Sequence, residues 1–225
     1  MIRNVSNSDL GRAGIVYREL KRRITELHYK PGEKLSEIRI ASELGFGRSP
    51  IRTALSRLQS EGWIEVSPQS GTFIRGLSDD EIREILESRL VLEPYLAGLA
   101  AKRASDAELG RMREIFTAFG DRVSRDRLDE YLDLDLHFHM SVYEAARNKL
   151  IADFLINLID KVRWIRRGSI DSLARIQGAY KEIRFVLDAM ESRDARAASA
   201  AMRTHIANTL EFRKHKQKFP LASAG

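Results

Sequence analysis

The stretch PGEKLSEIRIASELGFGRSPIRTALSRLQSEG, residues 31–62, decides the fold of the N-terminal part of this chain. It contains two short helical patterns separated by Gly45-Phe46-Gly47. Each pattern places apolar residues on one face: Ile38, Ala41 and Leu44 in the first, and Ile51, Leu55 and Leu58 in the second. Two short helices joined by a tight glycine-containing turn are typical of a helix-turn-helix.

The start of the second helix carries the residues that point to a function. Ser49 is the expected N-cap, and Pro50 suits the first helical position, where a missing N–H is no loss. Arg48 and Arg52 lie one turn apart and off the apolar stripe. The second helix of this motif lies in the DNA major groove, where an arginine can grip guanine with two hydrogen bonds. We therefore expect this helix to contact DNA bases.

The flanking segments complete a winged helix-turn-helix, for which we assign residues 1–76. Residues 63–66 and 72–74 have the composition of two short strands, and 67–71 form a turn with proline and glycine between them. Residues 16–27 form an amphipathic helix that closes the small core.

A family resemblance follows from the segments PGEKLSE, RIASELGF, GRSPIRTALSRLQSEGWI and SGTFI. Together they resemble the DNA-binding domain of the GntR family of bacterial transcription regulators over residues 12–75. The resemblance implies DNA-binding roles for Arg48, Ser49, Arg52 and the wing-tip Gly71. In the fatty-acid-responsive member another contact arginine falls at Ile38, which makes the adjacent Arg39 the candidate here. The family usually has Ser or Thr where this chain has Gly47, so a hydroxyl that could contact phosphate is missing.

Charge and composition limit the other possibilities. The net charge is +6, of which residues 1–76 contribute +5 from 13 Lys+Arg and 8 Asp+Glu. This excess fits DNA binding, although a solvated basic surface would look the same. No apolar run reaches about 18 residues and no signal-peptide pattern is present, so we expect a cytoplasmic protein without membrane contact. The absence of cysteine excludes disulfides, thiolate metal sites and a cysteine nucleophile.

The remainder of the chain is predicted to be an antiparallel six-helix bundle, which makes the fold mainly α. We assign residues 77–215 to this domain and 216–225 to a tail. The helices are expected at 79–103, 105–124, 127–146, 149–168, 171–191 and 194–214.

Arg89 interrupts the inward apolar stripe of the first bundle helix. A buried charge without a partner is costly. Arg89 is therefore either half of a structural ion pair with Glu93, one turn later, or an anion-binding residue in a cavity of the bundle.

Three further polar residues interrupt apolar stripes and could bind a metal. Asp135 and His139 are four residues apart on one helix face, and His205 lies in the middle of the inward face of the last helix. Three nitrogen and oxygen ligands could hold a divalent cation with positions left open. The alternative is that they are satisfied core residues. His137 faces elsewhere, and His28 and His215 have no partner in the sequence.

A second resemblance covers residues 79–212, through ESRLVLEPYLAGLAA, DLHFHMSVYEAARN and VLDAMESRDARAASAAMRTHI. These segments resemble the all-helical FCD ligand-binding domain of the FadR-type GntR regulators. The resemblance implies that Asp135, His139 and His205 are metal ligands for Zn, Ni or Mn. The fourth ligand position falls on Ile183, in a wholly apolar stripe. Either a weaker three-ligand site survives or the pocket is metal-free.

These observations predict a ligand-responsive transcription regulator. We expect a homodimer that binds a palindromic DNA operator and is controlled by a small carboxylate, with Arg89 as the effector-binding residue. We expect no catalytic residues. A metal-dependent enzyme with a DNA-binding appendage is the alternative, because the three metal candidates could activate a water. An architectural DNA-binding protein with a purely structural bundle is a third possibility.

Overall fold

The computed structural model describes residues 7–168 and 172–214. These residues divide into two compact units, of which one ends at Ser78 and the other begins at Asp79. His215 and the proposed tail 216–225 lie outside the described residues.

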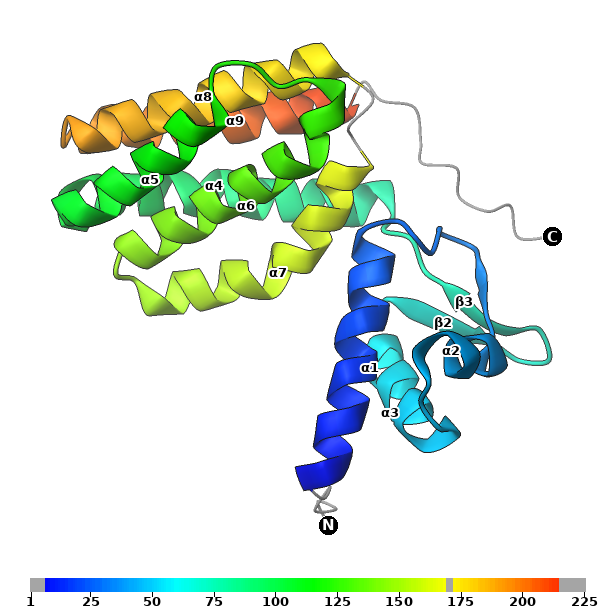
Figure 1. Ribbon diagram of the computed structural model, residues 1–225. Coiled ribbons are helices and arrows are strands. Elements are labelled where there is room, and N and C mark those ends of the chain that lie inside the picture. The colour runs from blue at the N-terminus through cyan, green and yellow to red at the C-terminus, as the bar shows by residue number, and fades with distance from the viewer. Residues whose placement is uncertain (1–6, 169–171, 215–225) are drawn as a thin grey trace. The chain divides into compact units, whose positions relative to one another are not determined.

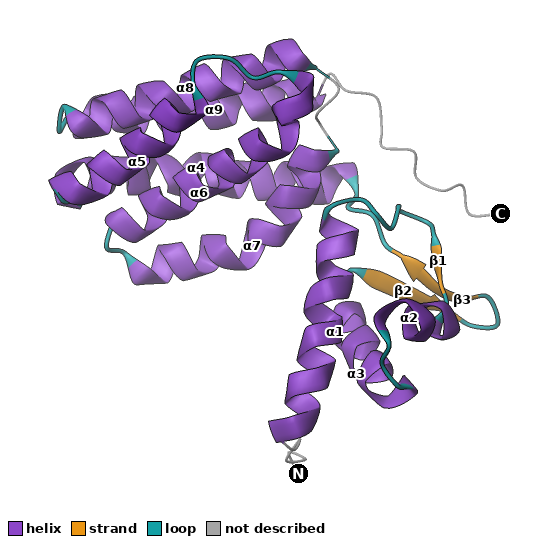
Figure 2. Ribbon diagram, in the orientation of Figure 1, coloured by secondary structure: helices purple, strands orange, loops and turns teal. Residues whose placement is uncertain are grey.

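The N-terminal unit is a winged helix-turn-helix (Figure 1). Its elements are α1 (Asn7–Thr25), β1 (Lys34–Leu35), α2 (Glu37–Leu44), α3 (Arg48–Ser60), β2 (Ile64–Ser67) and β3 (Gly71–Ile74). The three strands form an antiparallel sheet in the order β1-β3-β2, shown in orange in Figure 2. The sequence did not predict β1, because two residues are too few to show the alternation of a strand.

The core of this unit is formed by the inner faces of its helices and the sheet. Its fully buried side chains include Val16, Leu20, Ile24, Ile40, Ile51, Leu58 and Ile74. The apolar stripe predicted for α2 is wrong at one end, because Ile38 is 73% exposed and Ile40 is the buried residue of the helix. Ile40 lies on the same face as the half-buried Ala41 and Leu44, since Leu44 follows these two residues by four and three positions, whereas Ile38 is about 200° around the helix from Ile40.

The start of α3 also differs from the prediction. The helix begins at Arg48, and Gly47 is its N-cap, with φ −69° and ψ 171° and no side-chain cap hydrogen bond. Ser49 is therefore inside the helix and is not its cap, so the sequence prediction was wrong. Gly47 has the extended conformation of an N-cap, so the helix gains two residues, Arg48 and Ser49, relative to the predicted start at Pro50, and lacks a capping hydroxyl.

The second unit is helical throughout its described residues. It consists of α4 (Asp79–Arg103), α5 (Asp106–Phe119), α6 (Leu128–Ala145), α7 (Lys149–Arg167), α8 (Leu173–Glu191) and α9 (Ala195–Lys214), with a short 3₁₀ turn η1 (Arg125–Arg127) before α6. All six predicted helices are present. The second ends at Phe119, five residues before its predicted end, because Gly120 turns the chain with a φ of +84°.

Side-chain caps begin helices of this bundle, and one glycine allows two helices to approach closely. Ser105 and Glu108 form a capping box at the start of α5, and Asp194 Oδ1 accepts backbone hydrogen bonds from Arg196 and Ala197 at the start of α9. Helices α4 and α9 approach closely at Gly98, where a Cβ atom would lie 3.1 Å from the carbonyl oxygen of Ala195. Within the described part of the chain, none of the helices combines the length and the apolar character that crossing a membrane requires.

Candidate functional site

Helix α3 presents three of the DNA-binding candidates on its exposed face. Its buried face contains Ile51, Ala54, Leu55 and Leu58. Arg48, Ser49 and Arg52 are exposed, since they occupy the remaining face of the first two turns. The candidates therefore share a surface that a DNA groove could contact.

Arg52 is oriented by an acidic residue of the neighbouring helix. Its Nε lies 3.1 Å from both carboxylate oxygens of Glu37, in the first turn of α2. Within the described residues, Arg52 contacts Glu37 through Nε alone, so both Nη donors are left for another acceptor. The contact with Glu37 therefore orients the guanidinium group of Arg52, while its two Nη atoms can still donate to a base.

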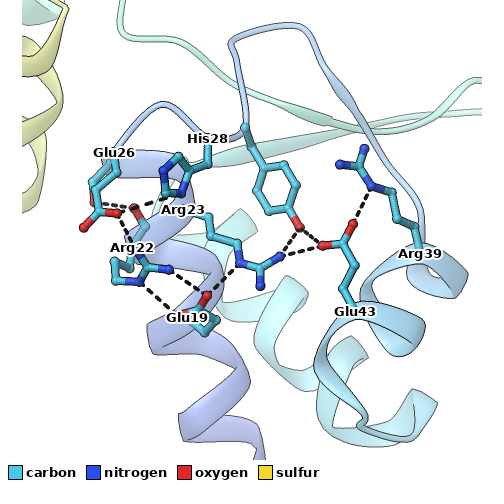
Figure 3. A network of polar contacts seen from close by, with 9 residues as sticks. Glu19, Arg22, Arg23, Glu26, His28, Arg39 and Glu43 are labelled. Atoms are coloured by element: carbon cyan, nitrogen blue, oxygen red, sulfur yellow. Dashed lines mark hydrogen bonds and ion pairs between the residues drawn. The ribbon is translucent and has the colours of Figure 1, made fainter.

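Arg39 takes part in a network of ion pairs, shown in Figure 3. Its Nε donates to Glu43 (2.7 Å) and its Nη1 donates to Glu33 (3.0 Å). The hydrogen bond to Glu43 is the main reason that the pKa of Arg39 is raised. The same Glu43 accepts a hydrogen bond from Tyr29. A DNA phosphate would have to compete with two carboxylates for Arg39. At the other end of the network, His28 Nδ1 lies 3.9 Å from Glu26.

The wing-tip glycine is required by its backbone. Gly71 opens β3 with a φ of +118°, a conformation that side chains rarely adopt. A Cβ atom here would also lie 2.8 Å from Cε of Lys34. The structure thus places Gly71 at the wing turn, as the resemblance implies, beside a lysine that sequence analysis did not single out.

In the helical unit, the three metal candidates lie together and are buried. One ligand atom from each of Asp135, His139 and His205 lies within 4.8 Å of the other two. Asp135 and His139 come from α6, and His205 comes from α9. Their positions four residues apart explain why the first two converge.

Both histidines are oriented by glutamates. His139 Nδ1 lies 2.8 Å from Glu93, and His205 Nδ1 lies 3.0 Å from Glu182. A carboxylate at one ring nitrogen favours the tautomer whose other nitrogen carries a lone pair for a metal. Burial lowers the pKa of His139 to about 4, so the ring is neutral near pH 7.

The chemistry of these residues fits a cation site that lacks a fourth protein ligand. Both buried ring nitrogens of His139 lack a hydrogen bond among the described residues, although Nδ1 lies close to Glu93. Nε2 lies 3.8 Å from Asp135 Oδ1, which leaves it available to an ion shared with that carboxylate. The helix α8 supplies the fully buried Ile183 where a fourth ligand would be needed. The donor set therefore suits a divalent ion with three protein ligands.

An arginine that the sequence analysis did not single out contacts this cluster. Nη1 of Arg166, near the end of α7, forms an ion pair with Oδ2 of Asp135. Burial would raise the pKa of Asp135, but nearby positive charge, chiefly that of Arg166, holds it below its usual value. The signal was available, because Arg166 follows the buried Val162 by one turn, as Arg89 follows an apolar residue in α4.

Arg89 is paired with Glu93, as the structural alternative supposed. Arg89 Nε lies 2.5 Å from Glu93 Oε1, and both side chains are almost completely buried. Tyr143 donates a 2.6 Å hydrogen bond to the same carboxylate oxygen. Arg89 therefore holds the glutamate that orients His139.

A cavity of about 70 Å³ lies beside this cluster. Its cationic lining includes Arg89, Arg166 and Arg175, and Asp135 and His205 also face it. Arg175 forms a two-point ion pair with Glu182, with both N–O distances 3.0 Å. The volume is below the roughly 300–1,000 Å³ of typical ligand pockets, so it would accommodate only a small ion or a few waters without rearrangement.

Comparison with known families matches both units. Residues 13–74 match the family described as bacterial regulatory proteins of the gntR family, and residues 84–208 match the FCD domain. The chain is 31% identical over 148 residues to an HTH-type transcriptional regulator of the TAR-I ttuE-ttuC' intergenic region of Agrobacterium vitis, covering 63% of this chain and 84% of that protein. It is 26% identical over 191 residues to the HTH-type transcriptional repressor RspR of Escherichia coli K12, covering 85% and 84% of the two chains.

Solved structures share the fold. A putative GntR transcriptional regulator from Rhodococcus superposes with a TM-score of 0.75 at 18% identity, covering 92% of this chain and 100% of that one. McbR/YncC of E. coli gives a TM-score of 0.71 at 17% identity, covering 90% and 97%. The matched families and relatives are transcription regulators, so they do not support the alternative of a metal-dependent enzyme.

Proposed function

The chain is a transcription regulator of the gntR family with an FCD domain, and from this premise we propose that it binds a palindromic operator as a homodimer under the control of a small carboxylate. The observation that carries the DNA part is the exposed face of α3, on which Arg48, Ser49 and Arg52 lie together. We place this activity in the cytoplasm, where bacterial DNA is found.

In this proposal Arg48 and Arg52 recognise bases and the remaining candidates support the contact. An arginine that binds guanine with two hydrogen bonds contributes about 1–3 kcal/mol of discrimination. The DNA phosphate backbone is contacted by the other candidates, Ser49, Arg39 and Gly71. Such contacts fix the position of the protein on the duplex but do not distinguish base sequences. Arg39 must exchange at least one carboxylate partner to reach a phosphate.

Operator affinity of variants tests this assignment. The operator is first selected from random duplexes. Arg48→Ala and Arg52→Ala should then each weaken the free energy of operator binding by about 1–3 kcal/mol. Each should also reduce the base preference at one position in each half-site. Arg75→Ala, in the segment after β3, is the comparison, because loss of a phosphate contact weakens all sequences alike. Unchanged operator affinity in both α3 variants would refute the assignment.

The bundle cavity supports the proposal of a small acid as effector. Arginine matches a carboxylate with a planar fork, and four arginines line the cavity: Arg89, Arg166, Arg175 and Arg213. Hydroxy acids and sugar acids are our preferred class, since a hydroxyl could complete the coordination of an ion. Because Arg89, Arg166 and Arg175 already have carboxylate partners, an effector that binds one of these three would have to replace its ion pair.

A divalent cation at Asp135, His139 and His205 is the second part of the proposal. The orientation of both histidines by glutamates and the unpartnered His139 Nε2 support it. When bound, the ion would supply a Lewis acid that attracts the effector's oxygens. Zn, Ni and Mn remain the candidates.

A thermal-shift screen tests the effector proposal. Small mono- and dicarboxylates and hydroxy acids are added with and without Zn²⁺, since a ligand at about 100 times its dissociation constant stabilises by about 2.7 kcal/mol. Arg89→Lys keeps the charge beside Glu93 but loses the planar fork, so it should fold and lose the acid-induced shift. A variant that responds normally would exclude Arg89 as the anchor.

A further inference from the structure

The carboxylates of Glu93, Asp135 and Glu182 around the cavity are each already paired with an arginine. Three ion pairs supply three cations and three anions: Arg89 with Glu93, Arg166 with Asp135, and Arg175 with Glu182. A divalent ion bound beside these pairs without any other change would add two positive charges to a buried site, which is costly.

Of these three arginines, Arg166 is the one that forms its ion pair with a proposed metal ligand. Its Nη1 contacts Oδ2 of Asp135, which is the only carboxylate in the three-residue metal cluster. Arg89 and Arg175 instead pair with the glutamates that orient the histidines. The side chain of Arg166 is 13% exposed and that of Asp135 is 2% exposed, so water screens their attraction weakly.

Resting on the metal site of the proposed function, we propose that Arg166 is an internal cation that competes with the divalent ion for Asp135. In the metal-free protein its guanidinium neutralises the carboxylate that a metal would otherwise neutralise. Arg166 contacts Oδ2 of Asp135, so a metal that binds through both carboxylate oxygens must displace it, and a metal that binds through Oδ1 alone is repelled by its charge. Arg166, together with the apolar Ile183, therefore sets how weakly this chain binds metal.

Zn²⁺ titration by calorimetry on the full-length protein tests the competition. A like charge within about 4–6 Å shifts the binding of a proton by one or more powers of ten, so Arg166→Gln should bind Zn²⁺ at least about tenfold more tightly than the natural protein. Arg167→Gln is the matched control, because the adjacent Arg167 pairs with Asp129 on the outside of the cluster. It should leave zinc affinity unchanged.

The Asp135→Asn variant separates failure of this inference from failure of the metal site. If Asp135→Asn abolishes zinc binding but Arg166→Gln binds no more tightly than the natural protein, the competition is refuted and the metal site stands. If Asp135→Asn binds zinc as well as the natural protein, the metal site itself is wrong and the competition falls with it.

Arg166→Gln leaves a buried carboxylate unpaired and could unfold without metal. In that case the titration uses Arg166→Ala refolded with millimolar methylguanidinium. This small cation takes the place of the guanidinium that the variant lacks. Apparent zinc affinity should fall as methylguanidinium rises in Arg166→Ala and stay constant in the natural protein. Zinc affinity independent of methylguanidinium in the variant would overturn the proposal.

Discussion

At the scale of single residues, paired charges determine what each arginine can do. Glu37 holds Arg52 by Nε and leaves its Nη donors available, whereas Glu33 and Glu43 bind Arg39 through both Nη1 and Nε. An arginine with its Nε anchored loses less rotamer freedom when it binds a base. This difference makes Arg52 the better candidate for base recognition.

Glu37→Gln should reduce sequence discrimination without reducing affinity for random DNA. The carboxylate no longer orients Arg52, so discrimination at the base that it contacts should fall by up to about 1–3 kcal/mol. Loss of a negative charge near DNA should meanwhile strengthen nonspecific binding slightly. Competition between operator and base-substituted duplexes measures both effects. Glu33→Gln, beside Arg39, is the control; equal loss of discrimination in both variants would contradict the positioning role.

Arg89→Ala should destabilise the protein strongly, because it leaves Glu93 buried without its cation. Removing one partner of a buried ion pair costs about 3–5 kcal/mol. Adding Glu93→Gln should recover part of this loss, since the neutral side chain needs no counter-charge. Urea unfolding of the two single variants and the double variant measures the coupling. Strictly additive free energies would show that the pair is not linked.

At the scale of elements, periodicity predicted the helices well and the short or buried features poorly. The bounds of α4, α7 and α9 agree with prediction within one residue, because their stripes are long. The two-residue β1 and the start of α3 could not be found, since each depends on backbone contacts rather than on a pattern. The inward position of Arg166 could be read from α7, where it follows the buried Val162 by one turn. Its pairing with Asp135 could not, because spacing within one helix does not show what a neighbouring helix places beside it.

Gly47→Ser should stabilise α3. It should also strengthen binding to DNA of any sequence, because it restores a hydroxyl that could contact phosphate. Gly47 already has the extended N-cap conformation, and a Cβ there would meet no atom within 4 Å. The hydroxyl would cap a backbone N–H, which is worth a few tenths of a kcal/mol relative to glycine. Thermal unfolding measures this gain. Gly47→Ala provides no acceptor, and an equal gain from it would argue against capping.

Ile183→His should convert the three-ligand cluster into a stronger zinc site. In a chelator the variant should be less stable by about 1–3 kcal/mol, because a buried polar group lacks a partner. Zinc should reverse that loss and raise its melting temperature more than that of the natural protein. Melting curves with zinc and with chelator, supported by elemental analysis, provide the measurement. An identical zinc response in both proteins would show that position 183 cannot reach the ion.

At the scale of the whole molecule, the uneven charge assigns different tasks to the two parts of the chain. Residues 1–76 carry +5 of the net charge of +6, which suits a polyanion, while the helical unit contains the buried polar cluster. A single small winged helix offers little surface for tight specific binding. This limitation is the physical reason for proposing a dimer.

Sedimentation of the free protein and of its operator complex should show two chains per duplex. Two recognition helices must meet half-sites on one side of the DNA, where a helical turn is about 10–10.5 bp. Inserting roughly 5 bp between the half-sites should therefore abolish tight binding by moving them to opposite sides. One chain per operator, or tolerance of the insertion, would exclude this mode.

The two-residue strand β1 has a consequence for how the N-terminal unit opens in solution. Gly32 N–H donates to Ile74, and Ile74 N–H donates to Glu33, so the segment before α2 is fastened to the wing. Backbone amides joined in this way exchange with deuterium only when the joined segments separate. The wing and the approach to α2 should therefore share one protection class in hydrogen exchange and behave as a single cooperative foldon.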